Sequence, residues 1–306
     1  MDDLSFDYSD DDLAIPHLGR GAMDDPEPET ATASEATPPE TDVPVADPEE
    51  GGERPSVCVA FRGVGGGVGT TSLAITTAHL FAQAKRGEVC LVDLDFALGM
   101  CGHYLDMGVT PDVRDFQADP LRVDANFVRA MLGHHEAGFS VLASPGISGG
   151  NEIVNPATVL KILDVIADMY PVVVLDVPRL LRPWTEAALM AADRVALVTE
   201  LNIPALHVTR QRLSELETMG VMQTDVVLSK YERRTFRATL RQTDAERAIG
   251  CKAAANITLD AITVSEAMNC GVPTTVAAPD SRYAKDAWAL ACHLSPHFAE
   301  RRRKRR

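Results

Sequence analysis

The sequence has 306 residues, which is enough for one large domain or two modest ones. Its net charge of −15 comes from the N-terminal region, because the first 54 residues contain 17 acidic and two basic residues while the remainder contains 27 of each. This balance lacks the basic face or stripe typical of nucleic-acid-binding domains, so nucleic acid is not an expected partner.

Residues 1–54 are rich in Asp, Glu, Pro, Thr and Ala and contain few large apolar side chains. Such a segment buries too little surface to offset the entropy of ordering it, so we expect a disordered acidic tail. Its start, Met1-Asp2-Asp3-Leu4, lacks the basic-then-apolar order of a signal peptide. No segment approaches the roughly 18 uninterrupted apolar residues of a membrane helix. These observations predict a cytoplasmic location.

From Ser56 onward, short apolar runs alternate with longer segments of helical periodicity. The predicted strands are Val57–Phe61, Val89–Val92, Phe139–Ala143, Val172–Leu175, Arg194–Val198 and Val226–Leu228. The predicted helices cover residues 71–85, 155–169, 183–191, 204–219, 235–248 and 281–294. Strands of this kind that alternate with helices predict a mostly parallel sheet with helices on both faces. In the absence of an internal repeat, we expect one α/β domain over residues 55–298.

A glycine-rich loop follows the first predicted strand and leads into a helix. Such a loop allows backbone N–H groups to approach a phosphate, and the helix N-terminus adds partial positive charge. The dinucleotide pattern G-x-G-x-x-G does not fit, whereas the P-loop pattern G-x-x-x-x-G-K-[ST] fits with Val64 in place of its first glycine and Thr70 in place of its lysine. The candidate nucleotide-binding residues are Gly65, Gly66, Gly67, Val68, Gly69, Thr70, Thr71 and Ser72.

The same loop resembles the deviant Walker A motif of the ParA/MinD superfamily, K-G-G-x-G-K-[ST]. The matching residues are Gly66-Gly67-Val68-Gly69 and Thr71, while Gly65 stands where the superfamily has a signature lysine that reaches across a dimer interface. The CpaE/TadZ-type pilus-assembly branch resembles this chain in having G-T-T in place of G-K-T. The resemblance implies a P-loop NTPase fold, ATP and Mg²⁺ as cofactors, and a homodimer.

Two further segments carry the resemblance and supply acidic residues. Leu91–Gly99 resembles the D-x-D…G segment after the second strand of the superfamily, in which the second acid, here Asp95, helps to position magnesium or the attacking water. Val172–Arg179 resembles the Walker B strand and the D-x-P switch of the pilus-assembly branch, with Asp176 as its acid. The resemblance therefore implies Asp95 and Asp176 as catalytic residues, and Thr71, Asp95 and Asp176 as metal ligands.

Later motifs extend the resemblance over about residues 56–295. Ala192–Glu200 matches the next strand, and Ile262–Pro273 resembles the C-terminal segment that ends in E-A-x-x-x-G-x-P. Two features depart from the pattern. Ser229 stands where the superfamily has an adenine-contacting Asn, so we expect base recognition to be weakened or carried by backbone groups. The acidic tail takes the place of the receiver-like N-terminal domain that members of the branch often carry.

The absence of both loop lysines bears on activity. Phosphoryl transfer depends on positioning and on neutralising charge, and one charge-assisted hydrogen bond contributes about 1.5–3 kcal/mol. We therefore expect a weak ATPase or a pseudo-ATPase. Arg62, Arg179 and Arg182 are candidates to supply the missing charge, and the sequence does not decide among them.

The function that these features predict is a CpaE/TadZ-like localisation and assembly factor for a type IVb (Tad) pilus, with pilus and secretion-machinery proteins as partners. Two alternatives stay open: an active MinD/ParA-like ATPase that positions a septum, chromosome or flagellum, and a nucleotide-independent scaffold. The C-terminal tail, residues 299–306, contains the basic run Arg301–Arg306. Because such runs are attracted to anionic lipid, one interpretation is peripheral contact with the inner membrane or placement at the cell pole. A disordered end and an internal partner for the acidic N-terminal tail are the alternatives.

Overall fold

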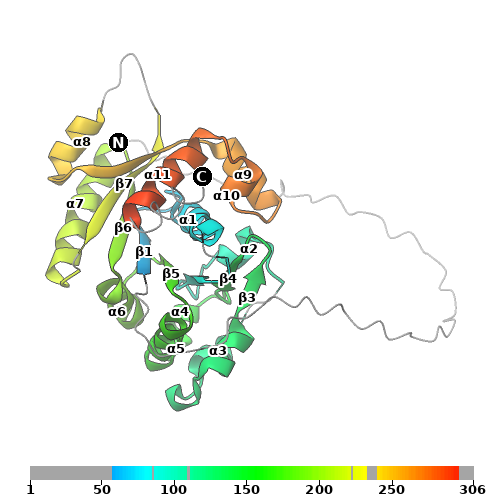
Figure 1. Ribbon diagram of the computed structural model, residues 1–306. Coiled ribbons are helices and arrows are strands. Elements are labelled where there is room, and N and C mark those ends of the chain that lie inside the picture. Colours follow the sequence, from blue (N-terminus) through cyan, green and yellow to red (C-terminus); the bar gives the residue numbers. More distant parts are fainter. Residues whose placement is uncertain (1–56, 85, 109–110, 222, 233–239, 296–306) are drawn as a thin grey trace, which may run out of the picture. The chain divides into compact units, whose positions relative to one another are not determined.

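The computed structural model describes residues 57–84, 86–108, 111–221, 223–232 and 240–295 (Figure 1). The predicted acidic tail over residues 1–54 and the predicted basic tail over residues 299–306 lie outside these residues. Part of the predicted helix over residues 235–248 also lies outside them. Within the described residues, none of the helices combines the length and the hydrophobicity that crossing a bilayer requires.

The core of the domain is an eight-stranded sheet with the strand order β3-β4-β2-β5-β1-β6-β7-β8. The strands are β1 (Val57–Gly63), β2 (Val89–Asp93), β3 (Gly133–His135), β4 (Phe139–Leu142), β5 (Val172–Val177), β6 (Arg194–Glu200), β7 (Thr224–Tyr231) and β8 (Ala253–Thr258). Strand β3 runs antiparallel to β4, and every other neighbouring pair is parallel. The prediction of a mostly parallel sheet is therefore confirmed.

Helices cover both faces of this sheet (Figure 1). They are α1 (Thr70–Ala84), α2 (Cys101–Tyr104), α3 (Ala125–Met131), α4 (Gly150–Ile153), α5 (Pro156–Met169), α6 (Pro183–Ala191), α7 (Ile203–Thr218), α8 (Gln242–Ile249), α9 (Ala261–Asn269), α10 (Thr274–Ala277) and α11 (Arg282–Leu294). Two short 3₁₀ segments, Val113–Gln117 and Pro120–Arg122, precede α3.

Side chains along the central strands alternate between two hydrophobic clusters. On β1, Val59 and Phe61 pack in the cluster that includes α1 and α11, whereas Ala60 packs in the cluster that includes α5 and α6. On β5, Val172 and Val174 face the first cluster, and Val173 and Leu175 face the second. This alternation decides the face on which each polar residue at a strand end emerges, because successive side chains of a strand point to opposite sides.

All six predicted strands are present, but β3 and β8 were not predicted. The sequence of β8, Ala253-Ala254-Ala255-Asn256-Ile257-Thr258, contains only one large apolar residue, and its burial is mostly intermediate because it lies at the edge of the sheet. Strand β3 is three residues long and contains two histidines. Edge strands of this kind lack the continuous apolar run that buried central strands show.

Candidate functional site

A cavity of about 420 Å³ opens where the carboxyl ends of β1, β2, β5, β7 and β8 meet α1 and α9. Its volume falls within the range of small-molecule sites. In open parallel α/β sheets, ligands bind outside the carboxyl ends of the strands. The predicted loop residues Gly65, Gly66, Gly67, Val68, Gly69, Thr70, Thr71 and Ser72 all line this cavity, together with Asp95 and Asp176.

The glycine loop holds its backbone N–H groups ready for a ligand. Gly67 and Gly69 have φ values of 68° and 89°, a region that glycine adopts without strain. Among the described residues, no group accepts a hydrogen bond from the backbone N–H groups between Gly65 and Ser72. Helix α1 begins at Thr70, so these N–H groups lie at the positive end of its dipole. Unpaired N–H groups at a helix N-terminus favour an anionic partner.

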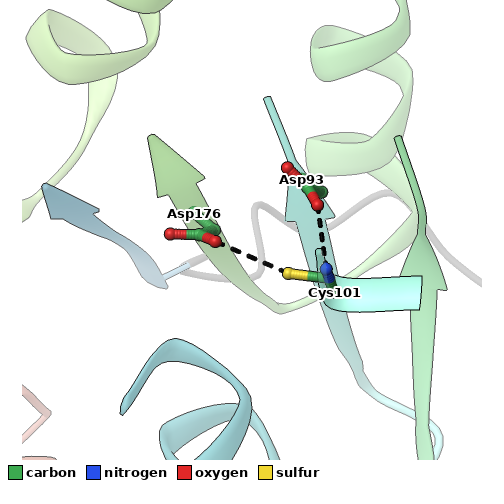
Figure 2. Close-up of side chains that lie close together, drawn as sticks. All are labelled: Asp93, Cys101 and Asp176. Carbon is green, nitrogen blue, oxygen red and sulfur yellow. Dashed lines mark hydrogen bonds between the residues drawn. The ribbon is translucent and has the colours of Figure 1, made fainter. Parts of the chain in front are cut away.

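A cluster of buried side chains faces the start of α1. The Thr71 hydroxyl donates a hydrogen bond of 2.6 Å to Oδ2 of Asp176, which places two of the predicted metal ligands in contact. Asp93 on β2 lies directly opposite Asp176 on β5 in the register of these two strands. The Cys101 thiol donates to Oδ2 of Asp176 at 3.6 Å, and its backbone N–H donates to Oδ2 of Asp93 at 3.0 Å (Figure 2). One ligand atom from each of Asp93, Cys101 and Asp176 lies within 4.8 Å of the others.

Burial dominates the electrostatics of the two carboxyl groups. It raises the pKa of Asp93 to about 8, and the charge of Asp176 adds to that shift. It raises the pKa of Asp176 to about 6, although hydrogen bonds from Thr71 and Cys101 act in the opposite direction. No Lys or Arg side chain pairs with either acid within the described part of the chain. Burial therefore favours the protonated form of the pair, and a bound cation would stabilise its ionised form.

Asp95, the third predicted metal ligand, lines the cavity but lies in a turn. Its Oδ1 accepts hydrogen bonds from the backbone N–H groups of Ala97 at 3.3 Å and Leu98 at 3.1 Å, and from the side chain of Asn151 at 3.2 Å. Its Oδ2 accepts none from the described residues, so this oxygen stays available to a ligand in the cavity. In this conformation it is Asp93, rather than Asp95, that lies next to Asp176.

The turn after β2 is tightly packed around Gly99. A Cβ on this residue would overlap the Cβ of Ser144 and lie 2.6 Å from both Oδ2 of Asp93 and the carbonyl oxygen of Asp95. The Ser144 hydroxyl donates to that same carbonyl oxygen at 2.6 Å. The glycine of the D-x-D…G segment is therefore required by the packing that positions the acids.

The structure separates the three candidate arginines. Arg62 emerges on the α6 and α7 side of the sheet, away from α1, and its guanidinium is 1% exposed and 4.0 Å from Oε2 of Glu215. Arg182 forms an ion pair with Glu152. Arg179 lines the cavity, and a Cβ on Gly66 would lie 3.9 Å from its guanidinium carbon and from both terminal nitrogens. Only Arg179, of these three, is placed to face the loop.

The ends of β7 and β8 form the opposite wall of the cavity. Ser229, which the sequence resemblance aligns with an adenine-contacting Asn, is buried there, and Leu259 is a partly exposed apolar residue of the same wall. Lys230 has a φ of 51°, next to an irregularity in the pairing of β7 with β8, and its ammonium group pairs with Glu200 at 2.9 Å. This wall therefore offers the apolar side chain of Leu259 and a hydroxyl on Ser229 that can donate or accept a hydrogen bond.

Sequence comparison finds no match: no protein-family model matches the chain, and no curated protein matches it significantly. Structural comparison does. A ParA family ATPase from Chlorobium tepidum is 20% identical with a TM-score of 0.71, over 79% of this chain and 100% of its own. The septum site-determining protein MinD of Pyrococcus horikoshii, solved with Mg-ADP, is 18% identical with a TM-score of 0.68, over 80% and 98%. A McdA variant from Cyanothece, solved with ATP, is 14% identical with a TM-score of 0.57, over 78% and 96%.

This chain has the fold of the ParA and MinD ATPases. In this ParA/MinD-type fold the cavity residues fit a magnesium–nucleotide ligand on two independent grounds. The loop offers unpaired N–H donors to phosphate oxygens. In the same cavity, the Thr71 hydroxyl and the buried carboxylate oxygens of Asp93 and Asp176 offer the hard oxygen ligands that Mg²⁺ prefers.

Sequence reasoning missed three residues of this site. Asp93 had a usable signal, because its position three residues after Cys90 and two after Leu91 places it on the α1 side of β2 by strand alternation. Cys101 and Asn151 had none, since the six cysteines show no paired spacing and Asn151 belongs to α4, which lies 55 residues beyond its partner Phe96 in the sequence.

Proposed function

We propose that this protein is an ATP-binding localisation and assembly factor of the CpaE/TadZ type for a type IVb (Tad) pilus, with slow or no ATP hydrolysis. The observation that carries the nucleotide part is the row of N–H groups from Gly65 to Ser72, unpaired within the described part of the chain, which lines the same cavity as Asp176, the carboxylate that the Thr71 hydroxyl contacts. The Mg-ADP bound to MinD and the ATP bound to McdA, proteins of the same fold, support this ligand. The G-T-T sequence and the D-x-P switch support the pilus branch.

The geometry supports binding more strongly than turnover. When bound, Mg²⁺ would neutralise part of the phosphate charge. Thr71 and Asp176 would hold it, because their side chains are already in contact. Asp95, which the resemblance assigns to positioning the attacking water, has Oδ1 engaged by three donors. With no lysine in the loop, we expect the site to retain nucleotide rather than to turn it over rapidly.

The rim of the cavity supports a homodimer. Leu98, which is 76% exposed, lines it together with the exposed Met100 and Leu259, and the exposed Leu180 and Ile262 directly follow the lining residues Arg179 and Ala261 in the sequence. Apolar residues gathered around a polar cavity are typical of an interaction surface. We propose that two copies associate through this rim with nucleotide between them. The basic run over residues 301–306 would add reversible contact of the dimer with anionic lipid at the inner membrane or cell pole.

The pilus role is tested by deleting the gene in its host and counting surface pili by electron microscopy. The strain is complemented with the wild-type protein, with Gly69→Ala or with Gly220→Ala. Both glycines have a positive φ, 89° and 84°, so the two variants impose similar backbone strain, but only Gly69 lies in the cavity loop. We expect Gly220→Ala to restore pili and Gly69→Ala not to.

Two other outcomes assign a different function. Normal piliation of the deletion strain would overturn the pilus role. Full complementation by Gly69→Ala would leave the pilus role standing and indicate a nucleotide-independent scaffold.

A positioning ATPase is the second candidate, favoured by the similarity of fold to the septum site-determining protein MinD. It predicts defects of septum, chromosome or flagellum placement in the deletion strain. It also predicts ATP turnover by the purified protein that membranes or DNA stimulate. Absence of both effects, together with loss of pili, would favour the assembly factor.

A further inference from the structure

The charged side chains that line the cavity are unequally balanced. Four acids, Asp93, Asp95, Asp176 and Asp260, line it together with two cations, Arg179 and Lys230. Lys230 is already paired with Glu200. Arg179 forms no ion pair and donates no side-chain hydrogen bond within the described part of the chain. It is therefore the cation of this lining that is available to a ligand.

The position of Arg179 follows from the path of the chain after β5. The strand ends at Val177, and Pro178 then restricts the backbone before Arg179 reaches the loop. The buried Arg62 donates a hydrogen bond of 3.1 Å to the carbonyl oxygen of Arg179 and so fixes the backbone at this position. The exposed guanidinium then lies against Gly66, where the absence of a side chain leaves it 3.9 Å from a Cβ position.

We propose that Arg179 supplies the positive charge that the loop has lost with its lysines, by binding the terminal phosphates of the nucleotide. This inference rests on the proposed nucleotide binding. The guanidinium lies next to Gly66 and lines the same cavity as the loop, so a phosphate held by the N–H groups of Gly66 and Gly67 would be within its reach. Arginine presents a planar fork of donors that matches two phosphate oxygens, and lysine presents a single point charge.

Two consequences distinguish this role from a general effect of charge. First, Arg179 binds the phosphates, so the affinity for ATP should depend on it far more than the affinity for adenosine, which has no phosphate. Second, a lysine at position 70, where the P-loop pattern has one, should make Arg179 dispensable. The Thr70 side chain that now stands there has no charge. Its hydroxyl oxygen packs close to Gly63, because a Cβ on Gly63 would lie 2.5 Å from it.

The test is a binding titration of the full-length protein with ATP and with adenosine, both with Mg²⁺, at low and at high salt. The variants are Arg179→Ala, Arg179→Lys and Arg182→Ala, each checked for an unchanged thermal unfolding transition. Arg182→Ala is the matched control, because it removes the same charge from the same segment at a side chain that pairs with Glu152. We expect Arg179→Ala to weaken ATP binding about tenfold to hundredfold, with little change for adenosine. Arg179→Lys should be intermediate, and Arg182→Ala should match the wild type.

Rescue completes the experiment. Thr70→Lys introduced together with Arg179→Ala should restore most of the lost ATP affinity. If the wild type binds ATP and Arg179→Ala binds it equally well, the role of Arg179 is overturned while the nucleotide site stands. The role is also overturned if Arg179→Ala weakens ATP and adenosine by the same factor. If the wild type binds no ATP, the proposed nucleotide binding itself fails.

Discussion

The two halves of the cavity differ in how the fold constrains them. The loop from Gly65 to Ser72 is open: its N–H groups have no acceptor among the described residues, and Cβ atoms on Gly65 and Gly67 would meet nothing nearer than 3.5 Å. The acidic half is closed, because Asp93 and Asp176 are buried and Gly99 has no room for a Cβ. Packing thus fixes the position of the acids, whereas the loop offers donors that a bound anion would satisfy.

The largest effect should come from filling the closed half. We expect Gly99→Ala to lower the free energy of unfolding by about 2–3 kcal/mol, because the new methyl group overlaps Ser144 and crowds Asp93. Gly65→Ala, whose Cβ meets only Val68 at 3.5 Å, should cost less than about 1 kcal/mol. Urea denaturation followed by circular dichroism measures both. Equal losses would mean that the two halves are packed alike.

The next effect concerns magnesium. Asp176→Asn keeps the shape of the side chain but removes its charge, so the enhancement of ATP affinity by Mg²⁺ should fall roughly tenfold or more. Affinity measured in EDTA should not fall, since the backbone N–H groups of the loop do not contact this side chain. Titrations with and without Mg²⁺ separate the affinity for ATP alone from its enhancement by Mg²⁺. An unchanged enhancement would show that Asp176 is buried for packing only.

A positive charge added to the loop should raise ATP affinity, whereas the substitution of Asp176 lowers it. We expect Thr70→Lys to raise ATP affinity about tenfold, and this gain should shrink at high salt because it is electrostatic. Thr70→Gln, which lengthens the side chain without adding charge, is the control. A gain shared by both variants would point to packing rather than to charge.

The last effect is a pH dependence in the helix that carries the loop. His79 of α1 forms a 2.7 Å hydrogen bond with Thr275 of α10, and burial, followed by the nearby His135, lowers the pKa of His79 to about 4. Below its ordinary value of 6.5 the unfolded chain takes up a proton that the folded chain resists, so the free energy of unfolding should fall between pH 6.5 and 4. His79→Gln should show a shallower fall, and identical slopes would contradict this assignment.

The sheet and the loop could be predicted because their signals are local. Buried central strands such as β1 and β5 show continuous apolar runs, and the spacing of Gly69 and Thr71 is contained in a few residues. The edge strand β8 lacks such a run, since half of its residues are alanine. The polar and short elements of the fold therefore escape a periodicity argument.

The rest of the site depends on tertiary packing. Cys101 and Asp176 are 75 residues apart in the sequence, and they meet because α2 packs at the end of β2. The sequence makes the three arginines equivalent candidates. In the structure, strand alternation places Arg62 on the face of the sheet away from α1, and Arg182 forms an ion pair with Glu152. The position of Arg179 against Gly66 depends on the path of the loop after β5, which no local pattern specifies.

The central claim, that the open loop binds a nucleotide, is tested most directly by calorimetric titration of the full-length protein with ATP and Mg²⁺. We predict saturable binding that requires Mg²⁺ for full affinity and that Asp95→Ala weakens, because Asp95 lines the cavity beside the acidic pair. No detectable heat of binding at millimolar ATP would contradict the account and would leave a ParA/MinD-type fold that serves as a scaffold.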